Sequence, residues 1–112
     1  MTETKYPGET EELLHHLDSW PHLHIERGTD CGILRMRDRV VGTLNLAMHA
    51  LSVSVPPDAV GPMLESDSLL RRTTDGVSVH VADIESRAAA EALVRRRVDL
   101  ERFAWQRRVA SP

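Results

Sequence analysis

Cysteine and aromatic side chains are scarce in this 112-residue chain. The single cysteine, Cys31, excludes an internal disulfide and any zinc site built from paired cysteines, and it is typical of a protein of the reducing cytoplasm. Aromatic residues make up only 4% of the chain, so aliphatic side chains have to fill the interior. We therefore predict a cytoplasmic protein with a core of Leu, Val, Ile and Met.

Long apolar runs and the sequence motifs of several enzyme classes are also missing. No segment approaches the roughly 20 apolar residues of a membrane span, and the polar start MTETKYPGETEE does not match a signal peptide. The chain has no G-x-S-x-G, no glycine-rich phosphate loop and no H-E-x-x-H. These absences predict a soluble protein that does not contact a membrane, and the sequence identifies no cofactor.

What is present suits one globular domain. The chain is 41% hydrophobic and 28% charged, and its length is enough for one ordinary core. It contains no internal repeat, and Pro, Gly and Asp interrupt it at short intervals. We predict a single domain over residues 1–112, with flexible ends at residues 1–8 and 107–112.

Hydrophobic periodicity alternates between the helical and the extended pattern along the chain. Helices are predicted over residues 9–19 and 58–66 and from Ile84 onward, and strands over residues 22–26, 32–37, 40–48, 51–55 and 77–81, with a strand or loop over residues 68–74. Strands joined by short connections pair antiparallel. The predicted fold is an α+β two-layer sandwich, with a mainly antiparallel sheet of about five strands and helices on one face.

Turns and helix starts are predicted from single residues. Asp38-Arg39 and Asp75-Gly76 are interpreted as turns between strands, and Asp58 and Asp83 as N-caps of the second and third helices. Arg97 falls inside the apolar stripe of the last helix. This position predicts either an arginine stem that snorkels to water or a helix that breaks near Asp99.

Alternation of apolar and polar residues within the strands predicts two different faces of the sheet. The dry face carries the apolar side chains and is covered by helices, and the wet face carries the polar side chains and is open to solvent. In residues 40–48 we expect Val40, Leu44, Leu46 and Met48 to point inward, and Val41, Thr43, Asn45 and Ala47 to point away. The polar residues expected on or beside the wet face are His22, His24, Glu26, Arg35, Arg37, Thr43, Asn45, His49, Ser52, Ser54, Ser78 and His80. This surface is the predicted location of the functional site.

A metal site is one hypothesis for this surface. In His22-Leu23-His24-Ile25-Glu26 the two imidazoles and the carboxylate project from one side of a strand, about 7 Å apart. Such ligands suit zinc, iron or copper. One strand cannot close a coordination sphere, so His49 or His80 would have to supply a further ligand. The same spacing also arises from ordinary alternation on an exposed face.

Catalysis is a second hypothesis. His24 or His80 would act as general acid or base, and Arg35 or Arg37 would stabilise an anionic substrate. Whether the protein is an enzyme stays open at this point, because clusters of titratable residues can be purely structural.

Binding without catalysis is the interpretation that we favour. The wet face would bind a small molecule or a protein partner through His22, Thr43, Asn45, His49, Ser52, Ser54 and Ser78. It could also pair with a second copy of the chain in a homodimer. Nucleic acid is a weaker alternative, carried by six arginines between residues 95 and 108 that leave an excess of four positive charges over Asp99 and Glu101.

Three segments resemble the small bacterial "luciferase domain" proteins. They are RMRDRVVGTLNL (35–46), VSVPP (53–57) and DGVSVHV (75–81), and with the long helix that follows the resemblance covers residues 34–102. It implies a small antiparallel sheet backed by helices. The family's third strand carries a glycine followed by His-x-His, and here Gly42 is followed by Thr43 and Asn45 at the histidine positions. The resemblance points to the same wet face.

Overall fold

A computed structural model describes the backbone of residues 5–110 and the side chains of residues 8–104. The helices and strands follow the order α1 (Lys5–Asp18), β1 (His24–Arg27), β2 (Cys31–Met36), β3 (Arg39–Asn45), β4 (Ala50–Ser54), α2 (Pro57–Ser66), β5 (Arg71–Arg72), β6 (Gly76–His80) and α3 (Ile84–Ala110). The six strands pair antiparallel in the order β1-β2-β3-β4-β6-β5. The predicted α+β class is confirmed, and β5 adds a strand to the five that the sequence predicts.

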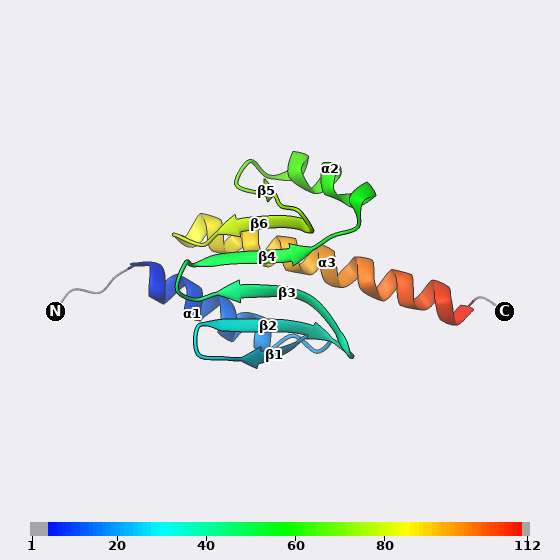
Figure 1. Cartoon of the computed structure of the whole chain (residues 1–112), viewed down its shortest axis with the longest axis horizontal. Helices are drawn as coiled ribbons and strands as arrows, with labels where there is room; N and C mark the ends of the chain where they lie inside the picture. Colours follow the sequence, from blue (N-terminus) through cyan, green and yellow to red (C-terminus); the bar gives the residue numbers. More distant parts are fainter. Residues whose placement is uncertain (1–4, 111–112) are drawn as a thin grey trace.

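The helices take different positions around the sheet. Figure 1 shows α1 and α3 behind the sheet, whereas α2 lies at its edge beside β5 and β6. The last turns of α3 continue past the strands. Residues 5–8 and 107–110, which fall in the ends predicted to be flexible, belong to α1 and α3. The remaining residues of those two ends, 1–4 and 111–112, lie outside the described part of the chain.

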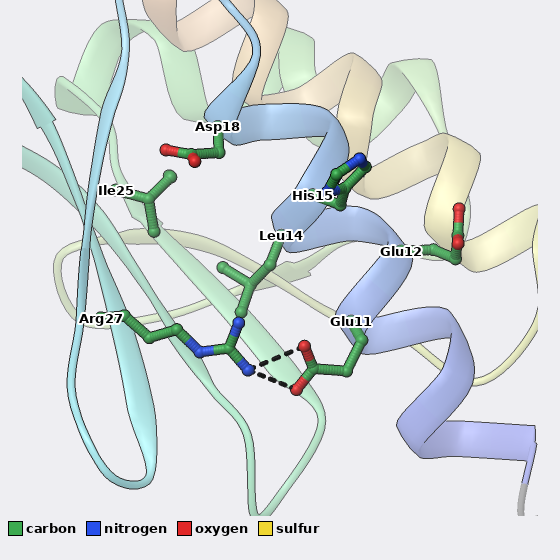
Figure 2. Close-up of a pocket in the computed structure, with 7 residues that line it drawn as sticks. All are labelled: Glu11, Glu12, Leu14, His15, Asp18, Ile25 and Arg27. Carbon is green, nitrogen blue, oxygen red and sulfur yellow. Dashed lines mark hydrogen bonds and ion pairs between the residues drawn. The ribbon is translucent and has the colours of Figure 1, made fainter.

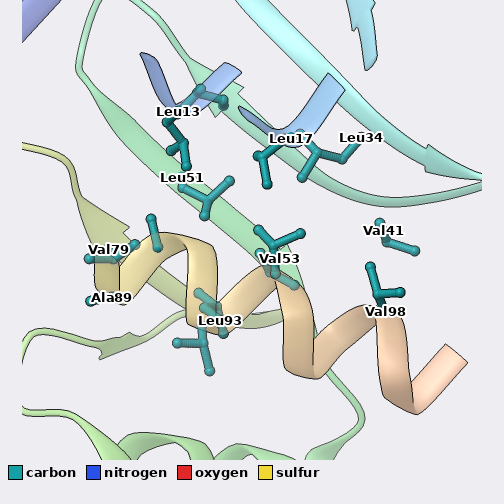
Figure 3. Packing of buried hydrophobic residues seen from close by; sticks show 14 of the residues in the cluster. Leu13, Leu17, Leu34, Val41, Leu51, Val53, Val79, Ala89, Leu93 and Val98 are labelled. Atoms are coloured by element: carbon teal, nitrogen blue, oxygen red, sulfur yellow. The ribbon is translucent and has the colours of Figure 1, made fainter. Parts of the chain in front are cut away.

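One hydrophobic core fills the space between the sheet and the two helices behind it. Figure 3 shows Leu13 and Leu17 of α1 and Leu93 of α3 directed at the same strands, where Leu51 and Val53 of β4 are buried. Burying one such side chain stabilises the fold by about 1.5 to 3 kcal/mol. The alternation predicted for β4 and β6 is confirmed.

A β-bulge reverses the predicted orientation of two valines. The register between β2 and β3 shifts between Leu34 and Arg35, and Val41 is the extra residue on β3. Val41 is therefore 1% exposed and Val40 is 44% exposed, the opposite of the predicted pattern. At the bulge, the Ser54 hydroxyl donates a hydrogen bond to the Val41 carbonyl at 3.2 Å.

The predicted strand over residues 40–48 ends earlier than expected. β3 stops at Asn45, and residues 46–49 form the turn into β4. The Asn45 side-chain oxygen accepts a hydrogen bond from the Met48 backbone N–H at 3.0 Å, which stabilises this turn. Met48 is consequently 67% exposed and Leu46 is only partly buried, so the prediction that both point inward is wrong for Met48.

The two predicted N-caps have different outcomes. Asp83 caps α3, because its carboxylate accepts a hydrogen bond from the Ser86 backbone N–H at 2.9 Å and the Ser86 hydroxyl accepts one from the Asp83 N–H. Asp58 does not cap α2, which begins at Pro57. Proline at the first helical position has no N–H to satisfy and its φ is already helical, so Asp58 lies in the first turn instead.

Arg97 does not follow either of the two predictions for it. α3 continues without a break through Asp99, and Arg97 is only 6% exposed. Its Nε donates to the Ser54 carbonyl at 2.5 Å, and its Nη1 donates to the Glu101 carboxylate at 3.1 Å. The guanidinium is buried with its charge paired, and it ties α3 to the end of β4.

Candidate functional site

The open face of the sheet carries a row of hydroxyl groups. Thr43, Ser52 and Ser78 pair in register across β3, β4 and β6. In Figure 1 this face looks toward the viewer, with α1 and α3 behind it. A depression of about 370 Å³ lies over part of the row, beside the 73–75 turn. The structure therefore places these three predicted binding residues together.

Two other predicted binding residues have structural roles. The Asn45 side chain stabilises the turn between β3 and β4. The Ser54 hydroxyl donates a hydrogen bond to the Val41 carbonyl at the bulge. Both side chains already use hydrogen-bonding capacity that a ligand would need.

His49 and His80 lie far from the other candidate histidines. His49 ends the β3–β4 turn, where its φ is 54° and its Nδ1 is 2.9 Å from the Thr10 hydroxyl of α1. His80 pairs with Ala50 at the same end of the sheet. His24 lies at the opposite end, close to the β2–β3 turn, and three strands separate it from β6. The metal hypothesis required His49 or His80 to lie beside His24, and the structure does not meet this condition.

The other predicted residues converge on one cleft. The basic cleft, as we name it, has a volume of about 630 Å³ and lies where β1, β2 and α3 meet. Its lining residues are Pro21, His22, Leu23, His24, Arg35, Met36, Arg37, Glu101 and Arg102. Three arginines and two histidines thus share a cleft with one carboxylate, and the segments that supply them, 21–37 and 101–102, are about 65–80 residues apart in the sequence.

Pairing across β1 and β2 sets the geometry of one wall of the basic cleft. His24 lies opposite Arg35 in the antiparallel register, so both side chains are on the same face. Arg35 Nε donates to the exposed carboxylate of Glu26 at 3.0 Å. Among the described residues, neither His22 nor His24 has a hydrogen-bond partner for its ring.

The backbone at the mouth of the basic cleft is strained. Residues 37–38 form the two-residue turn between β2 and β3, one position earlier than the predicted Asp38-Arg39 turn. Arg37 has a φ of 59°, a left-handed conformation that glycine normally adopts in such hairpins. Retaining arginine there costs on the order of 1 kcal/mol, which points to a role for its side chain.

Glu101 is the one carboxylate that lines the basic cleft, and two arginines hold it. Arg97 donates to it at 3.1 Å and Arg39 at 3.3 Å. Burial alone raises the pKa of Glu101, but the hydrogen bonds and charges of Arg97 and Arg39 outweigh burial and bring this pKa below the ordinary value of 4.5. Glu101 therefore stays ionised and offsets the positive charge of arginines that do not line the cleft.

The lowered pKa of Glu101 predicts how stability depends on pH. A carboxyl whose pKa is lower in the folded state stabilises the fold above its unfolded pKa, and this contribution disappears as the pH falls through the folded pKa. We expect the difference in free energy of unfolding between the wild type and Glu101→Gln to be constant near pH 7 and to shrink as the pH drops below 4.5. Urea unfolding from pH 7 to pH 3 measures it, and a pH-independent difference would contradict the interpretation.

A second cleft, of about 410 Å³, lies between α1 and β1 and is mostly acidic. Figure 2 shows that Glu11 and Arg27 face each other across its mouth, joined by two hydrogen bonds of 2.6 and 2.7 Å. Asp18 and His15 line the rest together with apolar side chains. The Glu11–Arg27 pair uses the only cationic guanidinium among the residues that line this cleft, and none of the site residues predicted from the sequence lines it.

The residues that the structure describes contain neither a metal-binding cluster nor a membrane-spanning helix. Within the described part of the chain, no three or more His, Cys, Asp or Glu side chains are grouped as a metal ion requires, so His22, His24 and Glu26 do not form such a group. Over the same residues, no helix combines the length and apolar character needed to cross a membrane.

Sequence reasoning missed the part of the basic cleft that α3 supplies. From the sequence, Glu101 and Arg102 were recognised only as part of the charged end of the last helix. Hydrophobic periodicity does not predict which strands this end of the helix packs against. The one available signal was Arg97, because a charge within an apolar stripe requires a partner such as Glu101 one turn later.

No known protein family, curated protein or solved structure matches the chain. The resemblance to the luciferase-domain proteins consequently stays a prediction.

Proposed function

We propose that this protein binds a small anionic molecule in the basic cleft. The observation that carries the proposal is the convergence of Arg35, Arg37 and Arg102 with two histidines in one cleft of about 630 Å³. Isolated charges are usual on a protein surface, but like charges repel one another when they are gathered. An anion would relieve this repulsion.

The charge pairs around the basic cleft leave it positive. Glu101 is already compensated by Arg97 and Arg39, whose side chains do not line the cleft. Arg35 is paired with the exposed carboxylate of Glu26, an exchangeable surface pair. Among the described side chains, Arg102 has no ion-pair partner. A phosphate or carboxylate group would meet a net excess of donors.

The donors also have suitable chemistry. Guanidinium groups bind phosphates and carboxylates through two parallel hydrogen bonds, and an imidazole contributes a further N–H. They come from two neighbouring strands, the turns that flank these strands and a long helix, all of which are anchored to one core. A site of this kind is largely formed before the ligand arrives.

Titration with inorganic pyrophosphate tests the proposal. We expect the wild type to bind it measurably by isothermal titration calorimetry, and Arg35→Gln and Arg102→Gln each to weaken binding by about 10- to 100-fold, because each removes a charge-assisted hydrogen bond. Arg96→Gln is the matched control, since Arg96 is exposed on the same helix outside the cleft. Absence of binding, or equal losses in all three variants, would refute a site in this cleft.

The cytoplasm is the compartment that we propose for this activity. The single cysteine supports it, because proteins of oxidising compartments commonly stabilise small domains with disulfides.

A further inference from the structure

A smaller compartment, which no predicted function uses, borders the basic cleft. This compartment has a volume of about 240 Å³ and is lined by Trp20, Pro21, His22, Leu23, Arg95, Val98, Asp99 and Arg102. Four of these residues, Pro21, His22, Leu23 and Arg102, also line the basic cleft. A ligand held by the arginines of the basic cleft would reach the compartment by passing these shared residues.

The chemistry of the compartment differs from that of the basic cleft. Leu23 and Val98 are buried and give it an apolar floor. The Arg95 guanidinium carbon lies 5.1 Å from the centre of the Trp20 ring, which is a cation–π arrangement. Trp20 is partly buried and packs against the core, so its ring is held in place. An indole ring and a planar guanidinium both stack against flat rings.

We propose that the ligand is a phosphate ester that carries a flat aromatic ring, as a nucleotide does. The phosphate lies among Arg35, Arg37 and His24, and the ring lies in the compartment against Trp20 and Arg95. Arg102 borders both spaces and lies beside the link between ring and phosphate. This inference rests on the proposed anion site. It adds a role for the neighbouring compartment that Trp20 and Arg95 line.

AMP and ribose 5-phosphate form a matched pair of probes, because they share the sugar phosphate and differ by the adenine ring. We expect calorimetry to show that AMP binds the wild type at least about fivefold more tightly, the lower end of what stacking one base contributes. Trp20→Leu is expected to bring AMP down to the affinity of ribose 5-phosphate and to leave ribose 5-phosphate unchanged. Phe103→Leu, an exposed aromatic residue of α3 outside the compartment, is expected to retain the difference.

A second readout does not depend on how well Trp20→Leu folds. The chain has two tryptophans, so a Trp105→Phe variant reports on Trp20 alone. AMP is expected to change the fluorescence of Trp20, and ribose 5-phosphate at the same occupancy is expected not to. Arg95→Ala is expected to reduce the preference for AMP.

The outcomes separate the two proposals. If pyrophosphate and ribose 5-phosphate bind but AMP binds no more tightly and leaves the Trp20 fluorescence unchanged, the aromatic compartment is refuted and the anion site stands. If none of the three probes binds, the anion site itself is refuted, and this inference with it.

Discussion

Replacing Arg97 with alanine is expected to lower the free energy of unfolding by about 3 kcal/mol, since removing one partner of a buried ion pair typically has an effect of this size. The substitution leaves Glu101 with Arg39 alone and leaves the Ser54 carbonyl without its donor. A buried carboxylate left with only the exposed Arg39 as its partner accounts for most of the loss. Urea unfolding followed by circular dichroism at pH 7 measures it.

Two controls distinguish charge pairing from packing at this position. Arg96→Ala removes an exposed arginine from the same turn of α3 and is expected to change the stability by less than about 0.5 kcal/mol. The double variant Arg97→Met with Glu101→Leu removes both charges, and it is expected to recover most of the stability that Arg97→Ala loses. A double variant less stable than Arg97→Ala would show that shape, and not charge, is what the site requires.

The hydrogen bonds of Arg97 to Ser54 and Glu101 also affect the position of the residues that line the basic cleft. They attach α3 to the end of β4, and the same helix carries Glu101 and Arg102 into the cleft five residues or fewer beyond. Loss of the attachment is therefore expected to weaken anion binding without removing any residue that contacts the anion. Arg97 is a positioning residue in this sense.

Local patterns were enough to predict most of the fold. Alternation in LSVSV and VSVHV identifies β4 and β6, because each side chain of a strand points opposite to its neighbours and only one face meets the core. Alternation failed at Val40 and Val41, where a bulge adds one residue. A bulge is fixed by pairing with another strand, so residues 40 and 41 themselves carry no signal of it.

The candidate site was predictable only in part, for the same reason. The strand and turn residues His22, His24, Arg35 and Arg37 were identified from their spacing, and the structure places all four in the basic cleft. Whether His49 or His80 lies near His24 depends on the order and register of the strands. The observed order and register put His49 and His80 at the other end of the sheet. The α3 side of the cleft depends on where a 27-residue helix crosses the sheet, which no local pattern contains.

Gly76→Ala is expected to be as damaging as Arg97→Ala, with a loss of about 3 kcal/mol or more. The Asp75-Gly76 pair suggested a turn glycine, yet Gly76 is the first residue of β6 and pairs with Ser54. A methyl group there would lie 2.1 Å from the Val53 carbonyl oxygen and 2.6 Å from the Val55 nitrogen. Both atoms are backbone, so β4 and β6 would have to separate where their pairing begins.

Gly61→Ala provides a glycine control within the same protein. Gly61 lies in α2, and a methyl group there would have no heavy atom within 4 Å beyond its own helix and chain neighbours. Alanine in a helix interior is about 0.5 to 1 kcal/mol more favourable than glycine. The ring of Pro62 opposes this gain, because it disfavours the helical region for a preceding residue that carries a Cβ, so this variant is expected to change the stability by less than about 1 kcal/mol. Urea unfolding of the two variants beside the wild type measures both effects. If Gly76→Ala unfolds at the wild-type urea concentration, the close approach of β4 and β6 at this point is wrong, because no rotamer change can move a backbone carbonyl away from an added methyl group.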